Sequence, residues 1–106
     1  MSSQELLSKI EKNEAIVGII GLGYVGLPLA VSFAKKDIKV LGIEKSEKKV
    51  SSVNEGQNYI QDIDDEVLKS CVREGKLSAT SDASRIHECD ALIICVPTPL
   101  DHFKKP

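Results

Sequence analysis

A chain of 106 residues is long enough for one domain at most, and 42% hydrophobic with 28% charged residues is the composition of a folded globular protein. The formal net charge of −2 argues against nucleic-acid binding through bulk charge. No apolar run approaches the roughly 20 residues that a membrane-spanning helix needs, so no membrane partner is expected.

The cysteines and the first residues indicate a cytoplasmic protein. Cys71, Cys89 and Cys95 are odd in number and lack C-x-x-C spacing, which favours reduced thiols over a disulfide framework. Residues 1–13 are polar and charged, unlike a signal peptide. Capping-box spacing and an apolar stripe predict a helix over residues 3–12, and a frayed tail is the alternative. Residues 1–14 are therefore interpreted as an N-terminal helical extension.

Residues 15–36 predict a buried strand, a glycine turn and a helix. The strand is residues 15–20, and the helix follows from residue 27 to about residue 36. Between them stands the G-x-G-x-x-G pattern of Gly21, Gly23 and Gly26, with Tyr24 and Val25 inside it. Gly21 permits the sharp turn, Gly23 lets a pyrophosphate approach the backbone, and Gly26 allows close packing of helix on strand. The N–H groups and the positive dipole end of the helix then face the phosphates.

The pattern alone is weak, but the next strand strengthens it. Residues 38–43 form a second apolar segment, and Glu44 follows 18 residues after Gly26. An acid at this place accepts hydrogen bonds from the ribose of a dinucleotide. The alternative for Glu44 is a solvated charge at a strand end. Lys45, Lys48 and Lys49 lie beside it, and a solvated helix start is the simpler interpretation of Lys45 and Lys48.

The second half of the chain predicts two more strands. Ser46 caps a helix through residue 54 that Gly56 ends, and a loop over residues 57–63 carries Tyr59. The acids at positions 62, 64, 65 and 66 are interpreted as the start of a helix over residues 65–74 rather than a metal site. Strand three is residues 77–80, and Ser81 is expected to cap a short helix over residues 83–88 that carries a surface histidine, His87. Residues 91–96 form strand four, so apolar that it is expected to be central, with Cys95 buried in it.

These elements predict an α/β fold. Residues 15–106 are interpreted as a partial Rossmann-type domain, a parallel sheet with helices on both faces truncated to about four strands ordered 3-2-1-4. The segment of Val96, Pro97 and Thr98 then lies at the carboxyl end of strand four, beside the glycine turn. Thr98 faces the same crevice in this interpretation, and a plain turn residue between prolines is the alternative.

Three stretches resemble the N-terminal domain of the UDP-glucose/GDP-mannose dehydrogenase family. They are VGIIGLGYVGLPLA (17–30), NEGQNYIQDIDDEVL (54–68) and ALIICVPTPLD (91–101). The family consists of nucleotide-sugar 6-dehydrogenases that use NAD. Within it, the sequence most resembles the branch acting on UDP-N-acetylhexosamines. The resemblance implies that Lys49, five positions after the ribose acid, contacts the cofactor. It also implies that Thr98 lies by the cofactor, together with Val96 and Pro97 of the same motif.

The resemblance also implies what this chain lacks. The family's catalytic cysteine and lysine and its UDP-binding domain lie beyond residue 106, and none of the three cysteines fits the nucleophile's motif. We therefore expect no catalytic residue here, and an N-terminal fragment or truncated product that is inactive alone. Its full-length relative would oxidise the C6 alcohol of a UDP-sugar to a carboxylate in two hydride transfers to NAD.

Two alternatives remain open at this point. A non-catalytic nucleotide-binding or interaction module derived from such a domain fits the same residues. A hydroxyacyl-CoA or 6-phosphogluconate type of dehydrogenase is less favoured, because VPTP and NYIQDI are not typical of it.

Strand four also predicts self-association. Its outer side has no further strand to pair with in this sequence, and an unpaired apolar edge recruits another chain. A two-fold dimer that buries the strand-four side is expected. The alternative is a monomer in which the tail with Lys104 and Lys105 folds back over the edge.

Overall fold

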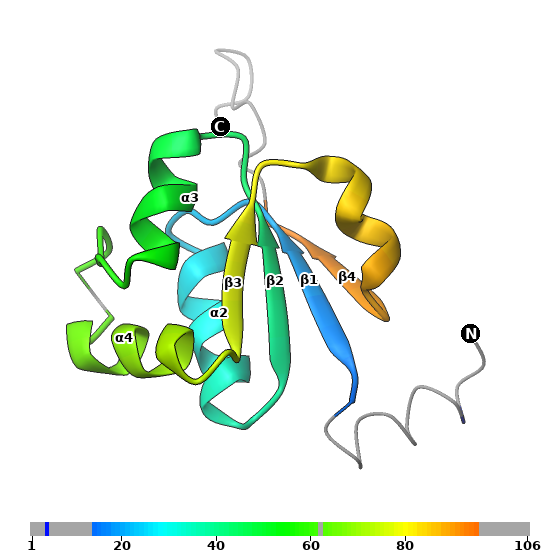
Figure 1. Ribbon diagram of the computed structural model, residues 1–106, viewed down its shortest axis with the longest axis horizontal. Helices are drawn as coiled ribbons and strands as arrows, with labels where there is room; N and C mark the ends of the chain where they lie inside the picture. Colours follow the sequence, from blue (N-terminus) through cyan, green and yellow to red (C-terminus); the bar gives the residue numbers. More distant parts are fainter. Residues whose placement is uncertain (1–3, 5–13, 62, 96–106) are drawn as a thin grey trace, which may run out of the picture.

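The protein is seen in a computed structural model that describes residues 4, 14–61 and 63–95 (Figure 1). The predicted helix over residues 3–12, apart from residue 4, lies outside the described part, as do Val96, Pro97 and Thr98. Four parallel strands form one sheet in the order β3-β2-β1-β4, which confirms the predicted fold. They are β1 (Ile16–Ile20), β2 (Lys39–Ile43), β3 (Leu77–Thr80) and β4 (Ala91–Ile94). The helices are α2 (Gly26–Lys35), α3 (Glu47–Asn54), α4 (Asp65–Arg73) and a 3-10 helix η1 (Ala83–Glu88).

The helices are divided unequally between the two faces of the sheet. Helices α2, α3 and α4 share one core with the strands, and η1, which connects β3 to β4, crosses the opposite face (Figure 1). Right-handed crossovers require this arrangement, because the chain reverses direction along the sheet after β3. The largest core side chains with less than 2% exposure are Ile19, Leu22, Leu27, Leu68, Leu77 and Val53. Among the described residues no helix is long and apolar enough to cross a membrane.

Capping side chains and glycines set the ends of the helices. The Ser46 hydroxyl accepts from the Lys49 N–H at 3.3 Å, so Ser46 is the predicted N-cap of α3. Gly56 (φ 73°) and Gly75 (φ 76°) follow α3 and α4 in the left-handed conformation that ends a helix. The expected cap of η1 was wrong: Asp82, not Ser81, accepts from the Ser84 N–H, at 3.0 Å.

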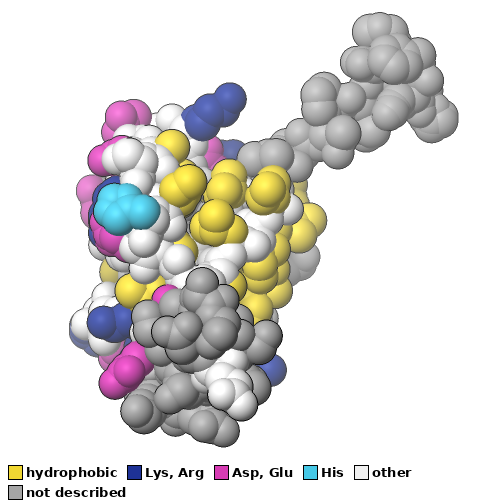
Figure 2. Space-filling model, turned by 90° about the vertical axis from the view of Figure 1, so that its right-hand side faces the viewer, with side chains coloured by type: hydrophobic (Ala, Val, Ile, Leu, Met, Phe, Trp, Pro, Cys, Tyr) yellow, Lys and Arg dark blue, Asp and Glu magenta, His cyan; other side chains and the backbone are white. Residues whose placement is uncertain are grey.

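Strand β4 is not central, contrary to the sequence prediction. It ends at Ile94 and, in the part of the chain that the structure describes, pairs only with β1. Alternation along the strand puts Leu92 (45% exposed) and Ile94 (70% exposed) on one face, and Figure 2 shows apolar side chains gathered on this side of the molecule. We call these two residues the β4 patch. An apolar run predicts burial, but η1 has no buried residue and leaves this part of the face open.

Candidate dinucleotide-binding site

The glycine turn has the geometry that its three glycines permit. Gly21 has a φ of 98°, which L side chains rarely adopt, and its N–H donates to the Ile43 carbonyl at 2.8 Å. A Cβ on Gly26 would lie 1.7 Å from the Gly21 carbonyl oxygen, so α2 starts this close to β1 only with glycine there. A Cβ on Gly23 would meet no atom within 4 Å. The backbone at Gly23 is therefore open to a ligand.

A crevice of about 920 Å³ opens at the carboxyl ends of the strands. Its walls come from the glycine turn, the end of β2, the first turn of α3, the β3–η1 connection and the residue after β4. They include Gly21, Gly23, Tyr24, Val25, Glu44 and Lys49, six of the predicted cofactor residues. Gly26 is buried behind the turn and does not line the crevice. Parallel strands place all these segments together because their carboxyl ends meet at one edge of the sheet.

Glu44 is half-buried and hydrogen-bonded, which contradicts the alternative of a solvated charge. Its Oε1 accepts from the Leu22 N–H at 2.8 Å, and its Oε2 accepts from the Ser46 N–H at 2.9 Å. A carboxylate oxygen has two lone pairs, so each still has room for a second donor. The crevice thus holds a fixed carboxylate that is able to accept from ligand hydroxyl groups.

Tyr59 lies on the other side of the glycine turn. Its hydroxyl donates to the Leu22 carbonyl at 2.6 Å, and the Lys49 Nζ lies 5.9 Å from the centre of its ring. Burial, with a smaller contribution from the Glu44 charge, raises the pKa of Tyr59 to about 12. Tyr59 also lines a second hollow of about 360 Å³ with Gly23, Tyr24, Lys48 and Lys49. Sequence reasoning gave Tyr59 no role, because hydrogen bonds between residues 37 apart leave no local pattern.

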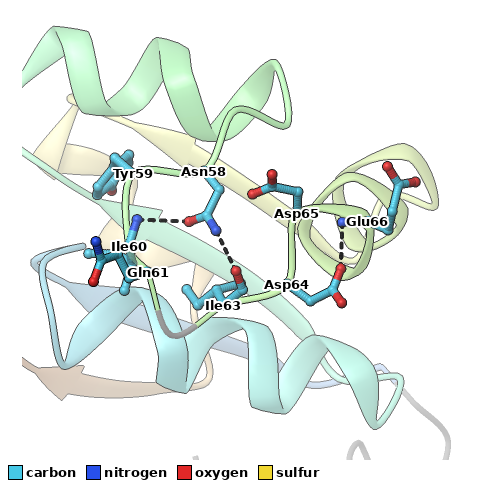
Figure 3. A pocket seen from close by; sticks show the side chains of 8 residues that line it. All are labelled: Asn58, Tyr59, Ile60, Gln61, Ile63, Asp64, Asp65 and Glu66. Carbon is cyan, nitrogen blue, oxygen red and sulfur yellow. Dashed lines mark hydrogen bonds between the residues drawn. The ribbon is translucent and has the colours of Figure 1, made fainter.

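The acids near residue 64 start a helix, as predicted. Asp64 caps α4 by accepting from the Glu66 N–H at 2.8 Å, and Asp65 and Glu66 occupy its first turn (Figure 3). In Figure 3 Tyr59 points away from these acids, on the far side of Asn58. Within residues 14–61 and 63–95, no group of three or more His, Cys, Asp or Glu side chains is placed to hold a metal ion.

Besides Ile20 and Ile43 at the strand ends, four further residues at the crevice were not predicted. Lys45, interpreted as solvated, is exposed yet forms part of the wall, and Ser81 and Ala83 line it beyond β3. The predicted strand order was the available signal for these two, since it puts the end of β3 next to the end of β2. Cys95 was expected inside a buried strand; it instead follows β4, is half-buried and lines the crevice.

The fold and the crevice define a class of protein. A glycine turn open at Gly23, a helix that starts directly behind it and a carboxylate at the end of the next strand fit the pyrophosphate and the ribose of NAD. This is a dinucleotide-binding α/β domain. The chain belongs to the UDP-glucose/GDP-mannose dehydrogenase family, whose NAD-binding domain matches residues 15–106.

Individual relatives agree with this assignment. The chain is 40% identical to UDP-N-acetyl-D-glucosamine 6-dehydrogenase of Salmonella typhi over 95 residues, which are 89% of this chain and 21% of that protein. It is 39% identical to UDP-N-acetyl-D-mannosamine dehydrogenase of Yersinia pestis, covering 85% of this chain and 21% of that one. GDP-mannose dehydrogenase of Pseudomonas aeruginosa, solved as a ternary complex, superposes with a TM-score of 0.75 at 30% identity, over 82% of this chain and 20% of that chain. The chain thus spans about a fifth of the length of these relatives.

Proposed function

We propose that this chain binds NAD in the crevice at the carboxyl ends of β1 and β2, as the cofactor-binding part of a nucleotide-sugar 6-dehydrogenase. One observation carries the proposal: the open backbone at Gly23 and the fixed carboxylate of Glu44 line the same crevice. Glu44 accepts from the adenosine ribose, and the turn of Gly21, Gly23, Tyr24 and Val25 receives the pyrophosphate. Gly26 acts from behind by letting α2 start at the turn.

Lys49 adds a positive charge on the same side of the site. Its ammonium lies over the Tyr59 ring and at the wall of the crevice, which supports a contact with the cofactor. We assign Val96, Pro97 and Thr98 to the cofactor site as well, on the family resemblance of the VPTP motif alone. When bound, NAD supplies a hydride acceptor, and the residues named here bind and orient it.

The substrate proposal concerns a longer protein. The two UDP-N-acetylhexosamine dehydrogenases reported above favour a UDP-N-acetylhexosamine, oxidised at C6 to the uronic acid for polysaccharide biosynthesis. Binding of that sugar requires the full-length context. We also propose a cytoplasmic location, which the three unpaired cysteines support.

Titration of the isotopically labelled chain with NAD, followed by NMR, tests the binding proposal. We expect chemical-shift changes in residues 21–26, 44–49 and 81–83, with NADP giving weaker binding than NAD. Absence of saturable shifts at millimolar NAD, or shifts gathered away from the crevice, would overturn it. The same titration separates NAD binding from a module that has kept the fold without the ligand.

The isolated chain is expected not to oxidise a nucleotide sugar. Burial raises the pKa of Cys71 and of Cys89, which makes both poor thiolates. NAD incubated with UDP-N-acetylglucosamine or UDP-glucose should give no NADH absorbance above a protein-free control. Turnover that copurifies with the chain through several columns would show that it contains a catalytic group.

A further inference from the structure

The peptide between Leu22 and Gly23 is held from one side by Tyr59. A trans peptide is planar, so its C=O and N–H point in opposite directions, and the described residues contain no cis peptide. The Tyr59 hydroxyl lies 2.6 Å from the Leu22 oxygen, at the end of the peptide to which the carbonyl points. The N–H of Gly23 therefore points away from Tyr59.

Gly23 lines both the second hollow and the crevice, and of these two spaces Tyr59 lines only the second hollow. The Gly23 N–H, which points away from Tyr59, is therefore expected on the side of the nucleotide crevice. Rotation of this one peptide would exchange its carbonyl and its N–H and present a negative dipole to a bound pyrophosphate.

Tyr59 is itself held in place by its own loop. The Asn58 side chain accepts from the Ile60 N–H at 2.9 Å and donates to the Ile63 carbonyl at 2.5 Å (Figure 3). Ile60 and Ile63 are 5% and 9% exposed and belong to the core. Residues on both sides of Tyr59 are therefore held in place, and these contacts fix the position from which its hydroxyl bonds to Leu22.

The neighbouring peptide is fixed independently. Glu44 accepts from the Leu22 N–H, so both polar groups of Leu22 are bound by side chains from other segments. Without Tyr59 the carbonyl would lose its partner at a residue whose exposure is 0%. A buried carbonyl without a donor is costly, and rotation of the Leu22–Gly23 peptide relieves that cost.

We propose that Tyr59 is a positioning residue for dinucleotide binding, which aims the Gly23 N–H at the pyrophosphate by holding the Leu22 carbonyl. The inference rests on the proposed function and assigns Tyr59 to the support of the phosphate subsite, acting through the turn. Its pKa of about 12 keeps the hydroxyl protonated, and so able to donate, well above neutral pH.

Comparison of two nucleotides tests this role in the Tyr59→Phe variant. Adenosine uses the ribose and base subsites, whereas ADP adds the pyrophosphate. We expect Tyr59→Phe to weaken ADP about tenfold, the scale of one lost hydrogen bond, and to change adenosine binding less than twofold. Ser70→Ala, which removes a hydroxyl hydrogen bond to Glu74 on α4, should change neither affinity. An equal loss for both nucleotides, or no loss for either, would overturn the inference.

A second measurement does not need the Tyr59→Phe variant, and both of its arms carry Tyr24→Phe, so any effect of that change on ADP binding is common to the two. Incorporation of 3-fluorotyrosine then alters only Tyr59 and lowers its hydroxyl pKa while nearly keeping its size. ADP affinity should then fall at a lower pH than in the same background with ordinary tyrosine, because tyrosinate cannot donate to the Leu22 carbonyl. Identical pH profiles would contradict the role of the hydroxyl. Failure of the unaltered chain to bind ADP at all would instead count against the proposed function.

Discussion

Glu44 and Leu22 are 22 residues apart in the chain and are joined by a hydrogen bond of 2.8 Å from the Leu22 N–H to Oε1. The carboxylate that is proposed to hold the ribose therefore also holds the turn that is proposed to hold the phosphates. The two subsites are built by one contact between the end of β2 and the glycine turn. A change at Glu44 is expected to affect both.

Glu44→Gln should lower stability and cofactor discrimination together. A glutamine has one acceptor oxygen, so either the Leu22 or the Ser46 N–H loses its partner, at a cost of about 1–3 kcal/mol in the free energy of unfolding. The wild type should bind 5′-AMP at least about tenfold more tightly than 2′,5′-ADP, which differs from it only by the 2′-phosphate that the carboxylate repels. In the variant this preference should disappear, since Lys45 and Lys49 remain beside the site.

Denaturant unfolding and nucleotide titrations measure the two effects. Glu55→Gln removes the same charge from an exposed position after α3 and serves as the control. Retention of the full preference for 5′-AMP over 2′,5′-ADP in Glu44→Gln would contradict the assigned role of the carboxylate.

The second and third glycines of the turn should respond differently to alanine. Gly26→Ala places a methyl group 1.7 Å from the Gly21 carbonyl, so α2 must move, and we expect at least about 2–3 kcal/mol of destabilisation. Gly23→Ala places its methyl in open space, and its stability should remain within about 0.5 kcal/mol of the wild type. Its NAD affinity should nevertheless fall at least about tenfold, because the methyl occupies the approach of the pyrophosphate. Normal NAD binding by a stable Gly23→Ala chain would show that the phosphates lie elsewhere.

Alkaline titration should show that Tyr59 ionises well above the ordinary pKa of a tyrosine. In a Tyr24→Phe variant only Tyr59 remains, and its tyrosinate absorbance should have a midpoint near pH 12 while the protein stays folded. A folded-state pKa raised above the unfolded value of 10.0 means that the folded chain holds the proton more tightly. The stabilising contribution of Tyr59 is then complete below pH 10 and is lost as the pH rises from 10 to about 12. A midpoint near 10 in chains that circular dichroism shows to be folded would contradict the buried environment of Tyr59.

The β4 patch is expected to be covered by a second copy of the chain. Leu92 and Ile94 are exposed at the end of the sheet where, among the described residues, β4 pairs only with β1. An apolar side chain next to an unpaired strand edge favours a two-fold dimer. Light scattering at several concentrations should show a dimer for the wild type and a monomer for Ile94→Lys. Ser51→Lys, on α3 at the opposite end of the sheet, should remain dimeric. A wild-type monomer at high concentration would refute this expectation.

Much of the fold was predictable because its signals are local. Apolar runs and helical periodicity located all four strands and the helices after residue 26 to within about two residues. Ser46 and Gly56 marked helix ends through the conformations that these residue types favour. The strand order followed from the handedness of the crossovers, which is a general property of parallel sheets. Strand β4 lies where the predicted order puts it, but its burial was predicted wrongly, because an apolar sequence indicates which side chains avoid water and not what covers them.

For the candidate site, local patterns in the chain were enough to name the residue types that a dinucleotide requires, namely the glycine turn and the acid after the second strand. Only the tertiary structure brought Leu22 between Glu44 and Tyr59 and placed Ser81 and Cys95 at the same crevice. The physical reason is the range of the interactions. A turn or a cap is decided by neighbouring residues, whereas hydrogen bonds across 22 and 37 residues depend on how strands and loops pack together.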